Sequence, residues 1–428
     1  MQDLTIDQFR PCNVPSPLSR QSTINFRRDQ ERLLVQPELS VLEDCLPLNT
    51  QSILELAGPR AELFFDPQHV KAAIVTCGGL CPGLNAVIRG LVMQLWHLYG
   101  CRHIEGIRYG YQGLGEHGET PLVLTPDLVS SLKAVGGTLL GSSRGTPPTS
   151  ELVDTLVKRG INMLFTIGGD GTMRGAQALW EEIKRRELQI SVIGIPKTID
   201  NDIPWVRRSF GFDTAVAEAV KAINVAEIEA KGMQNGIGIV KLMGRHAGFI
   251  TATACVASGN ANLCLIPEVS FSLQGQNGVL ALVEQRLKER HHAVIVVAEG
   301  AGQDLVHGEG RDASGNAKLG DIGLYLKQQL TDYFKSHPLN VGIKYIEPSY
   351  LIRSAPPTAS DQLYCDQLAR AAVHAAMAGK GGMLLGDWNG RITHVPIKAL
   401  EGKSRKVNPY GELWFSVREN TGQPVVIG

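Results

Sequence analysis

Short, wholly apolar runs alternate along this chain with longer segments in which apolar residues recur every three or four positions. The run Lys71–Thr76 is followed by two glycines, and residues 84–99 then show helical spacing, which predicts a strand, a glycine turn and a helix. The same order is predicted again further along, with strands at 163–167, 191–195 and 237–242 and helices from Met173, Asp213 and His246. Another strand is predicted at His292–Ala298, and helices at about 319–335 and 359–378.

Wholly apolar strands are typical of parallel sheets that helices cover on both faces. We therefore expect an α/β protein made of two Rossmann-like, three-layer domains with mostly parallel sheets. Residues 1–70 lack a sustained period and carry seven prolines, so an irregular N-terminal extension with one or two short helices is predicted there. Ligands of parallel sheets bind at the carboxyl ends of the strands, so the candidate site lies in the turns that follow them.

The composition narrows the classes of partner. The 428 residues are 43% hydrophobic and 20% charged, which suits two globular domains. Lys plus Arg and Asp plus Glu number 42 each, so no overall charge attracts nucleic acid or a membrane surface. No apolar run approaches the ~18 residues that span a bilayer. The eight cysteines are scattered without a Cys-x-x-Cys pair, so we expect reduced thiols in a cytoplasmic protein.

Two glycine-rich turns favour phosphate binding. Gly78 and Gly79 follow the first strand, and the helix after them offers free backbone N–H groups, although a tight turn without a ligand would look the same. The second turn, residues 168–172, adds a carboxylate at Asp170. A carboxylate among phosphate-binding amides makes sense when a divalent cation lies between them, so Asp170 is a candidate magnesium ligand. NAD kinases and diacylglycerol kinases have a similar loop.

The third turn, residues 196–202, distinguishes among these kinases. It brings a lysine, a threonine and two aspartates to the end of a buried strand. An Asp-Asn-Asp run is usually a solvated turn, but the apolar residues around this one favour a pocket. Phosphoryl transfer requires bound phosphates, a bridging cation and a group that accepts the proton of the attacking hydroxyl. The three turns together supply all of these.

Across roughly residues 71–390, the chain resembles the phosphofructokinase family, and the resemblance implies the phosphofructokinase fold. The strings that carry it are Pro196-Lys197-Thr198-Ile199-Asp200-Asn201-Asp202, Gly141-Ser142-Ser143-Arg144-Gly145, Met243-Gly244-Arg245, Ala298-Glu299-Gly300 and Tyr350-Leu351-Ile352-Arg353. The resemblance implies an ATP-binding domain at 71–211, completed by about 352–400. It also implies a fructose 6-phosphate-binding domain at 212–351, completed by about 401–428.

The resemblance also implies roles for individual residues in the phosphorylation of fructose 6-phosphate on its 1-hydroxyl by ATP, with Mg²⁺. Asp200 would be the general base, Thr198 would hold the transferring phosphoryl group, and Asp202 would steady the loop or the metal. The ATP contacts would be Gly79, Tyr111, Arg144, Asp170, Gly171 and Thr172. The sugar contacts would be Lys197, Met243, Gly244, Arg245, Glu299, Tyr350 and Arg353, with Arg245 also counted among the catalytic residues.

The phosphoryl donor depends on two positions. Relatives that use pyrophosphate carry a second aspartate after the metal carboxylate, whereas this chain has Gly171, which leaves room for the α-phosphate of ATP. Lys197, in contrast, is the residue usual in pyrophosphate users. The combination resembles the ATP-dependent plant and trypanosomatid group. A pyrophosphate-dependent enzyme and a catalytically silent regulatory paralogue are the alternatives, and Asp170, Thr198 and Asp200 argue against the second.

Two positions depart from the bacterial pattern. In bacterial relatives, the position of Gly236 holds an arginine that completes the sugar site of a neighbouring subunit. The position of Met93 holds an arginine of the effector site in those relatives. A shared sugar site must therefore be built differently here, and the sequence predicts no effector. The family resemblance implies a homo-oligomer, as a homotetramer.

Overall fold

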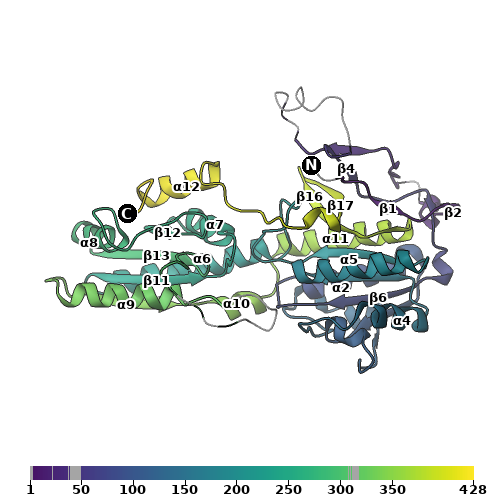
Figure 1. Cartoon of the computed structure of the whole chain (residues 1–428), viewed down its shortest axis with the longest axis horizontal. Coiled ribbons are helices and arrows are strands. Elements are labelled where there is room, and N and C mark those ends of the chain that lie inside the picture. Colours follow the sequence, from purple (N-terminus) through teal and green to yellow (C-terminus); the bar gives the residue numbers. More distant parts are fainter. Residues whose placement is uncertain are drawn as a thin grey trace. The chain divides into compact units, whose positions relative to one another are not determined.

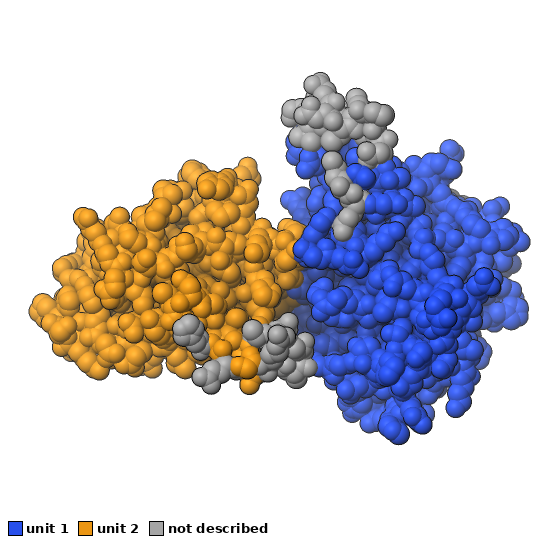
Figure 2. Space-filling view, in the orientation of Figure 1, with its two compact units in different colours: residues 1–198, 203–211, 354–403 blue, residues 199–202, 212–353, 404–428 orange. Residues whose placement is uncertain are grey.

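The computed structural model describes residues 3–21, 23–36, 38, 50–306, 308, 310 and 318–428. The chain divides into two compact units (Figure 2). Unit 1 comprises residues 1–198, 203–211 and 354–403, and unit 2 comprises residues 199–202, 212–353 and 404–428. Within the described ranges, no helix is long and apolar enough to cross a membrane.

Unit 1 is built on a nine-stranded mixed sheet (Figure 1). The central pairs are parallel, and the pairs nearer both edges are antiparallel. In sheet order the strands are β3 (Arg32–Leu34), β4 (Ile53–Leu56), β17 (Arg391–Pro396), β16 (Met383–Trp388), β10 (Ser191–Pro196), β9 (Met163–Gly168), β6 (Lys71–Thr76), β7 (His103–Ile107) and β8 (Leu122–Val123). Every residue of β9 and β10 is buried, so both faces of the central sheet are covered.

The longer helices described in this unit pack in two pairs, and a short helix, α3 (Pro126–Val129), lies between them in sequence. Helix α2 (Leu84–Met93) packs against α11 (Ala359–Met377), and α4 (Thr149–Arg159) packs against α5 (Asp170–Arg185). The helix predicted at 84–99 is present, but its second part, Gln94–Tyr99, is a π-helix.

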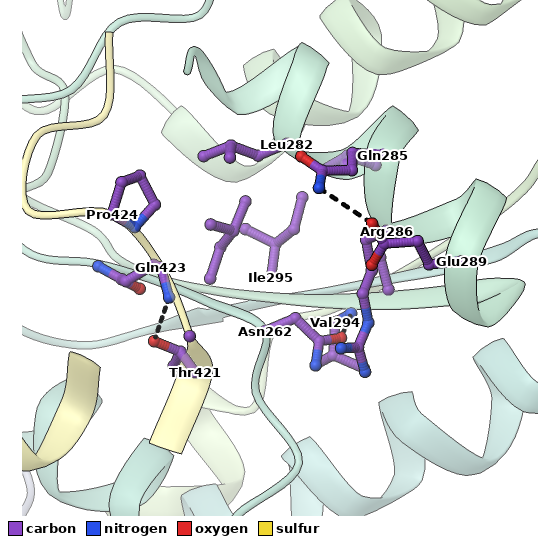
Figure 3. A pocket seen from close by; sticks show the side chains of 14 residues that line it. Asn262, Leu282, Gln285, Arg286, Glu289, Val294, Ile295, Thr421, Gln423 and Pro424 are labelled. Carbon is purple, nitrogen blue, oxygen red and sulfur yellow. Dashed lines mark hydrogen bonds between the residues drawn. The ribbon is translucent and has the colours of Figure 1, made fainter. Parts of the chain in front are cut away.

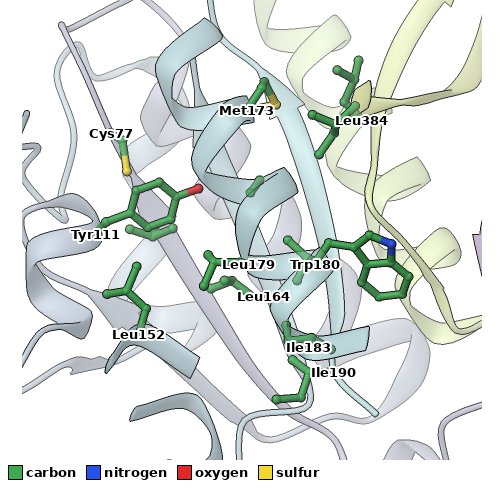
Figure 4. Packing of buried hydrophobic residues seen from close by; sticks show 14 of the residues in the cluster. Cys77, Tyr111, Leu152, Leu164, Met173, Leu179, Trp180, Ile183, Ile190 and Leu384 are labelled. Atoms are coloured by element: carbon green, nitrogen blue, oxygen red, sulfur yellow. The ribbon is translucent and has the colours of Figure 1, made fainter. Parts of the chain in front are cut away.

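The core of unit 1 gathers around α5, as Figure 4 shows. Met173, Leu179 and Trp180 of this helix lie in one buried cluster with Leu164 of β9. These α5 residues recur at helical spacing, so a single face of the helix is apolar and its opposite face is charged. This packing fixes where α5 begins, with Asp170 as its first residue.

The N-terminal segment is more regular than predicted. Among the described residues of this segment there are two short helices, and both are single 3-10 turns, Pro17–Arg20 and Pro67–His69. It also contains strands that the pattern of residues does not predict. β1 (Asp7–Gln8) pairs with β15 (Lys380–Gly381), β2 (Val14–Pro15) pairs with β5 (Glu62–Leu63), and β3 and β4 extend the large sheet. Strands of two to four residues are too short to show a period, and their partners lie far away in sequence.

Unit 2 is a three-layer domain around a four-stranded parallel sheet. The strands in order are β12 (Leu263–Leu265), β13 (His292–Ala298), β11 (Gly236–Leu242) and β14 (Gly342–Ile346). The helices are α6 (Phe212–Lys231), α7 (Phe249–Ser258), α8 (Val279–Arg290), α9 (Ile322–Lys335), α10 (Ser349–Ser354) and α12 (Glu412–Thr421). On β11, Val240 and Leu242 join one buried cluster and Ile237 and Ile239 join another, so helices cover both faces. The predicted α/β fold class is confirmed.

Candidate active site

The turns after three neighbouring strands of unit 1 lie side by side. Strands β6, β9 and β10 are parallel neighbours, with Thr76 opposite Ile167 and Pro196 opposite Gly168. The pairing continues beyond the strand ends, because the backbone N–H of Cys77 donates to Ile167 (2.9 Å) and that of Lys197 donates to Gly168 (2.9 Å). The structure therefore brings the beginnings of the three predicted turns to one edge of the sheet.

The glycines of the first turn differ in how strictly the fold requires them. Gly83 has φ 104°, and a Cβ there would lie 2.8 Å from the Cys365 sulfur. Gly79 has no atom within 4 Å of a hypothetical Cβ, so the space beside it is open. The Gly78 N–H donates to the Ser143 carbonyl (3.1 Å), which holds the loop of Arg144 against this turn. Arg144 itself is exposed.

The second turn presents its carboxylate to solvent. Asp170 is the first residue of α5 and is exposed, and its carboxylate pairs with Arg174 one turn further along the helix. Gly171 is exposed and does not have a left-handed backbone, and a Cβ on it would meet only the Arg174 guanidinium, at 3.8 Å. Neither the backbone nor packing therefore requires glycine at position 171.

Tyr111 lies beneath this turn. Its side chain is 2% exposed within the unit 1 core, and its hydroxyl donates to the Thr172 carbonyl at 2.9 Å. Burial raises the pKa of Tyr111 far above its usual value, so the phenol stays protonated and remains a donor. Thr172 is also buried. Tyr111 can thus position the turn, and a nucleotide contact by it would be indirect.

The third turn begins with a buried cation. Lys197 is 7% exposed, and its ammonium nitrogen lies 3.8 Å from the place that a Cβ on Gly78 would take. The Ser209 hydroxyl donates to the Thr198 carbonyl, which fixes the backbone just after the lysine. Lys197 therefore places a positive charge beside the first glycine turn.

In unit 2, the turns after β11 and β13 are joined. The backbone N–H of Glu299 donates to Leu242 (2.8 Å), and that of Gly300 donates to Gly244 (3.1 Å). A Cβ on Gly300 would lie 2.0 Å from the Arg245 carbonyl oxygen, so only glycine allows this close approach. The predicted sugar contacts Gly244, Arg245 and Glu299 are therefore neighbours at one edge of the sheet.

Asp200 lies among these charged groups. It is partly exposed, but its Oδ1 atom is buried. Burial is the largest cause that raises the pKa of Asp200, to about 7, followed by the negative charges of Asp202 and Glu299. Arg353 and a backbone hydrogen bond from Arg245 oppose this shift. A carboxyl group with this pKa can accept a proton near neutral pH.

The last predicted sugar contacts lie on and beside α10. Arg353 belongs to this helix, and its Nε atom lies 3.3 Å from the Met243 sulfur. Tyr350, one turn earlier, is 82% exposed. Arg353 thus contacts Met243, and its positive charge lowers the pKa of Asp200.

Two residues that support these turns are not marked by any pattern in the sequence. The Arg405 N–H donates to the Asp202 carbonyl at 2.7 Å, and its guanidinium donates to the Asn201 carbonyl at 3.4 Å. Glu268 accepts the backbone N–H groups of Gly248 (3.0 Å) and Val407 (2.8 Å). Their partners lie far away in sequence, so no local pattern could have revealed these roles.

The backbone around Gly236, where bacterial relatives have an arginine, leaves no room for a side chain. A Cβ at this position would lie 2.1 Å from the Ala230 carbonyl oxygen, between the end of α6 and the start of β11. No side chain fits there without a backbone shift, so this position cannot supply an arginine.

A cavity of about 210 Å³ lies elsewhere in unit 2, between α8, β12 and the segment after α12 (Figure 3). Leu282, Ile295 and Pro424 form its apolar walls, and Arg286 and Asn262 are polar groups at its side. None of the predicted phosphate or sugar contacts lines it.

Comparison with known proteins identifies the class. A family model described as "Phosphofructokinase" matches residues 71–376, which is most of the chain. The chain belongs to the phosphofructokinase family. It is 47% identical to the ATP-dependent 6-phosphofructokinase of Borreliella burgdorferi, with 99% of this chain and 97% of that protein covered. It is 48% identical to ATP-dependent 6-phosphofructokinase 7 of Arabidopsis thaliana, over 87% of this chain and 77% of that protein.

Solved structures agree on the fold. A pyrophosphate-dependent phosphofructokinase from Marinobacter aquaeolei aligns with a TM-score of 0.69 and 21% identity, over 84% of this chain and 92% of that one. Phosphofructokinase from Pichia pastoris in the T-state aligns with a TM-score of 0.65 and 22% identity, over 82% of this chain and 37% of that one. At this identity the likeness concerns the fold alone.

Proposed function

We propose that this protein is an ATP-dependent 6-phosphofructokinase, which transfers the γ-phosphate of ATP to the 1-hydroxyl of fructose 6-phosphate in glycolysis. Membership of the family and the names of the relatives at 47% and 48% identity support the reaction and the donor. The observation that carries the chemistry is Asp200, whose pKa is raised to about 7 among Asp202, Glu299 and Arg353.

Asp200 is the general base of the proposed reaction. The sugar hydroxyl must lose a proton as it attacks phosphorus, and a carboxylate with a raised pKa accepts that proton better than an ordinary one. Thr198 holds the phosphoryl group in transfer, and Arg144 offsets its charge through a guanidinium that suits phosphate oxygens. Asp202 steadies the loop, in keeping with its backbone contact to Arg405.

Fructose 6-phosphate binds to residues of unit 2. Met243, Gly244 and Arg245 hold the sugar, and Glu299 accepts its hydroxyl groups. Tyr350 and Arg353 bind the 6-phosphate, for which a planar guanidinium is well suited. The hydrogen bonds between the turns of Gly244 and Gly300 support this grouping.

ATP is the proposed donor because position 171 is open. Neither packing nor the backbone requires glycine at position 171, and the missing side chain leaves room for an α-phosphate. Lys197, buried beside Gly78, argues in the other direction, since an ammonium there could replace nucleotide contacts. We give Gly171 the greater weight because the relatives at 47% and 48% identity carry ATP in their names.

Magnesium fits Asp170. Asp170 offers one exposed carboxylate at the start of α5. That suits Mg²⁺, which commonly binds through one or two carboxylates, water and substrate phosphates. When bound, the ion neutralises the charge of the phosphates.

The family resemblance supports a homo-oligomer, specifically a homotetramer. Light scattering of the purified protein measures its oligomeric state.

A cytoplasmic location is proposed from the seven free cysteines of the described residues, because such thiols are typical of reducing compartments; Cys45 lies outside those residues. Some relatives are named as chloroplastic.

The general base is tested with Asp200→Ser. We expect turnover to fall by about three orders of magnitude or more while the Kd for ATP changes by less than about twofold, because the serine cannot accept the proton. Asp213→Ser, at the start of α6, is the control for loss of a carboxylate. A small effect on turnover would remove Asp200 from the base role.

A further inference from the structure

Arg174 reaches two parts of the nucleotide turn at once. Its guanidinium pairs with the Asp170 carboxylate, and its Nη2 atom lies 3.8 Å from the place that a Cβ on Gly171 would take. Both partners of the ion pair are well exposed, at 69% for Arg174 and 67% for Asp170. One cation therefore lies between the proposed metal ligand and the open space above Gly171.

We propose that Arg174 is a specificity-determining residue for ATP, which leaves Asp170 when magnesium and nucleotide bind and then donates to the phosphate that lies over Gly171. This inference rests on the proposed function. The sequence motifs give Arg174 no role. The role proposed here follows from the position of its guanidinium in the structure.

The exchange of partners is physically reasonable. An exposed pair at i and i+4 on a helix contributes little to stability, so its loss costs little. A divalent cation satisfies the Asp170 carboxylate in place of the guanidinium. The released guanidinium can then form a charge-assisted hydrogen bond to a phosphate oxygen, which is stronger than a neutral one.

The same geometry separates ATP from pyrophosphate. If the two phosphates of pyrophosphate occupy the positions of the β- and γ-phosphates, only ATP has a further phosphate to place over Gly171. Arg174 would then contact a group that pyrophosphate lacks. Its removal should weaken ATP binding and leave pyrophosphate binding unchanged.

The test compares Arg174→Met and Arg174→Lys with Arg185→Met in the full-length protein. Arg185 is a matched control, because it lies on the same helix, is also 69% exposed and pairs with Glu182 at 2.7 Å. Isothermal titration calorimetry gives the Kd for ATP with and without Mg²⁺ and the Kd for pyrophosphate, and steady-state kinetics gives the KM for fructose 6-phosphate.

We expect Arg174→Met to weaken ATP binding about tenfold in the presence of Mg²⁺, which corresponds to the loss of one charge-assisted hydrogen bond. The KM for fructose 6-phosphate and the Kd for pyrophosphate should stay within about twofold, and Arg174→Lys should recover part of the loss. Arg185→Met should bind ATP as the unchanged protein does.

The inference is overturned if the unchanged protein binds ATP and is catalytically active while the Kd of Arg174→Met for ATP lies within about twofold of the unchanged protein's Kd. An equal loss in Arg185→Met, or an equal loss of pyrophosphate binding, would also overturn it. A protein that neither binds ATP nor turns over would overturn the proposed function itself, so the two failures are distinguishable.

Discussion

Burial and two neighbouring carboxylates raise the pKa of Asp200, whereas one arginine lowers it. Burial, Asp202 and Glu299 all favour the protonated acid, whereas Arg353 favours the carboxylate. The result is a group that changes charge near neutral pH. Because its partners come from the ends of different elements, its pKa depends on the fold as much as on the loop that carries it.

The raised pKa of Asp200 predicts a pH dependence. Only the carboxylate accepts a proton, so kcat/KM for fructose 6-phosphate should fall about tenfold per pH unit as the pH drops below about 7. Folding stability should change in the opposite sense. The folded state keeps the proton between 3.8 and about 7 while the unfolded chain releases it, so stability declines as the pH rises through this window.

A pH–rate profile and thermal unfolding of the unchanged protein and of Asp200→Asn measure both effects. The asparagine should abolish the proposed base and also remove this part of the pH dependence of stability. A rate that stays constant between pH 5.5 and 8 would contradict the assigned pKa.

Arg353 is expected to determine sugar affinity. Arg353→Ala removes the guanidinium proposed for the 6-phosphate, and a charged hydrogen bond of this kind is worth about 1.5–3 kcal/mol. The KM for fructose 6-phosphate should therefore rise by about one to two orders of magnitude, while the KM for ATP changes little. Arg286→Ala is the control, because Arg286 is also partly buried in unit 2 but lines the separate cavity. An unchanged sugar KM would defeat the assignment.

At the scale of elements, the strands were predicted better than their surroundings. β6 and β13 have the predicted bounds, and β9 and β10 are one residue longer than predicted. Buried parallel strands are continuous apolar runs, so their signal is local. The start of α5 was placed at Met173, whereas the helix begins at Asp170, because the turn residues before it are polar and show no period.

The turns themselves were located from sequence, but their support was not. Glycines and charged residues after a strand mark a candidate site, which is why Asp170, Lys197 and Asp200 could be named. Arg405 and Glu268 hold the backbone of these turns through contacts with residues that are distant in sequence. Such contacts depend on tertiary packing, which a single sequence does not display.

Two glycines of one turn are expected to respond differently to alanine. Gly79→Ala should leave the melting temperature unchanged, because a Cβ there meets no atom within 4 Å, but it should weaken ATP binding by filling the space beside the turn. Gly83→Ala should destabilise the protein by about 2–4 kcal/mol, since φ is positive and the Cys365 sulfur is close.

Calorimetry of ATP binding and thermal unfolding separate these two outcomes. The turn would not be the nucleotide site if Gly79→Ala bound ATP normally. A Gly83→Ala protein of unchanged stability would contradict the packing described for the start of α2.

At the scale of the whole molecule, the proposed contacts are divided between the units. Asp170, Arg144 and Thr198 belong to unit 1, whereas Asp200 and Arg353 belong to unit 2. Each unit has its own sheet, and in each the predicted residues follow the carboxyl ends of strands, as expected for parallel α/β proteins. The family assignment rests on 306 residues of the chain, from 71 to 376, which include parts of both units.

The central claim is that this chain phosphorylates fructose 6-phosphate with ATP. The most direct test is the formation of fructose 1,6-bisphosphate by the purified protein with Mg²⁺, comparing ATP and pyrophosphate at equal concentration. We predict product with ATP and at least about a hundredfold less with pyrophosphate, because Gly171 leaves room for the α-phosphate. Product with pyrophosphate alone would contradict the donor assignment and give Lys197 the deciding role, and no product with either donor would contradict the proposed activity.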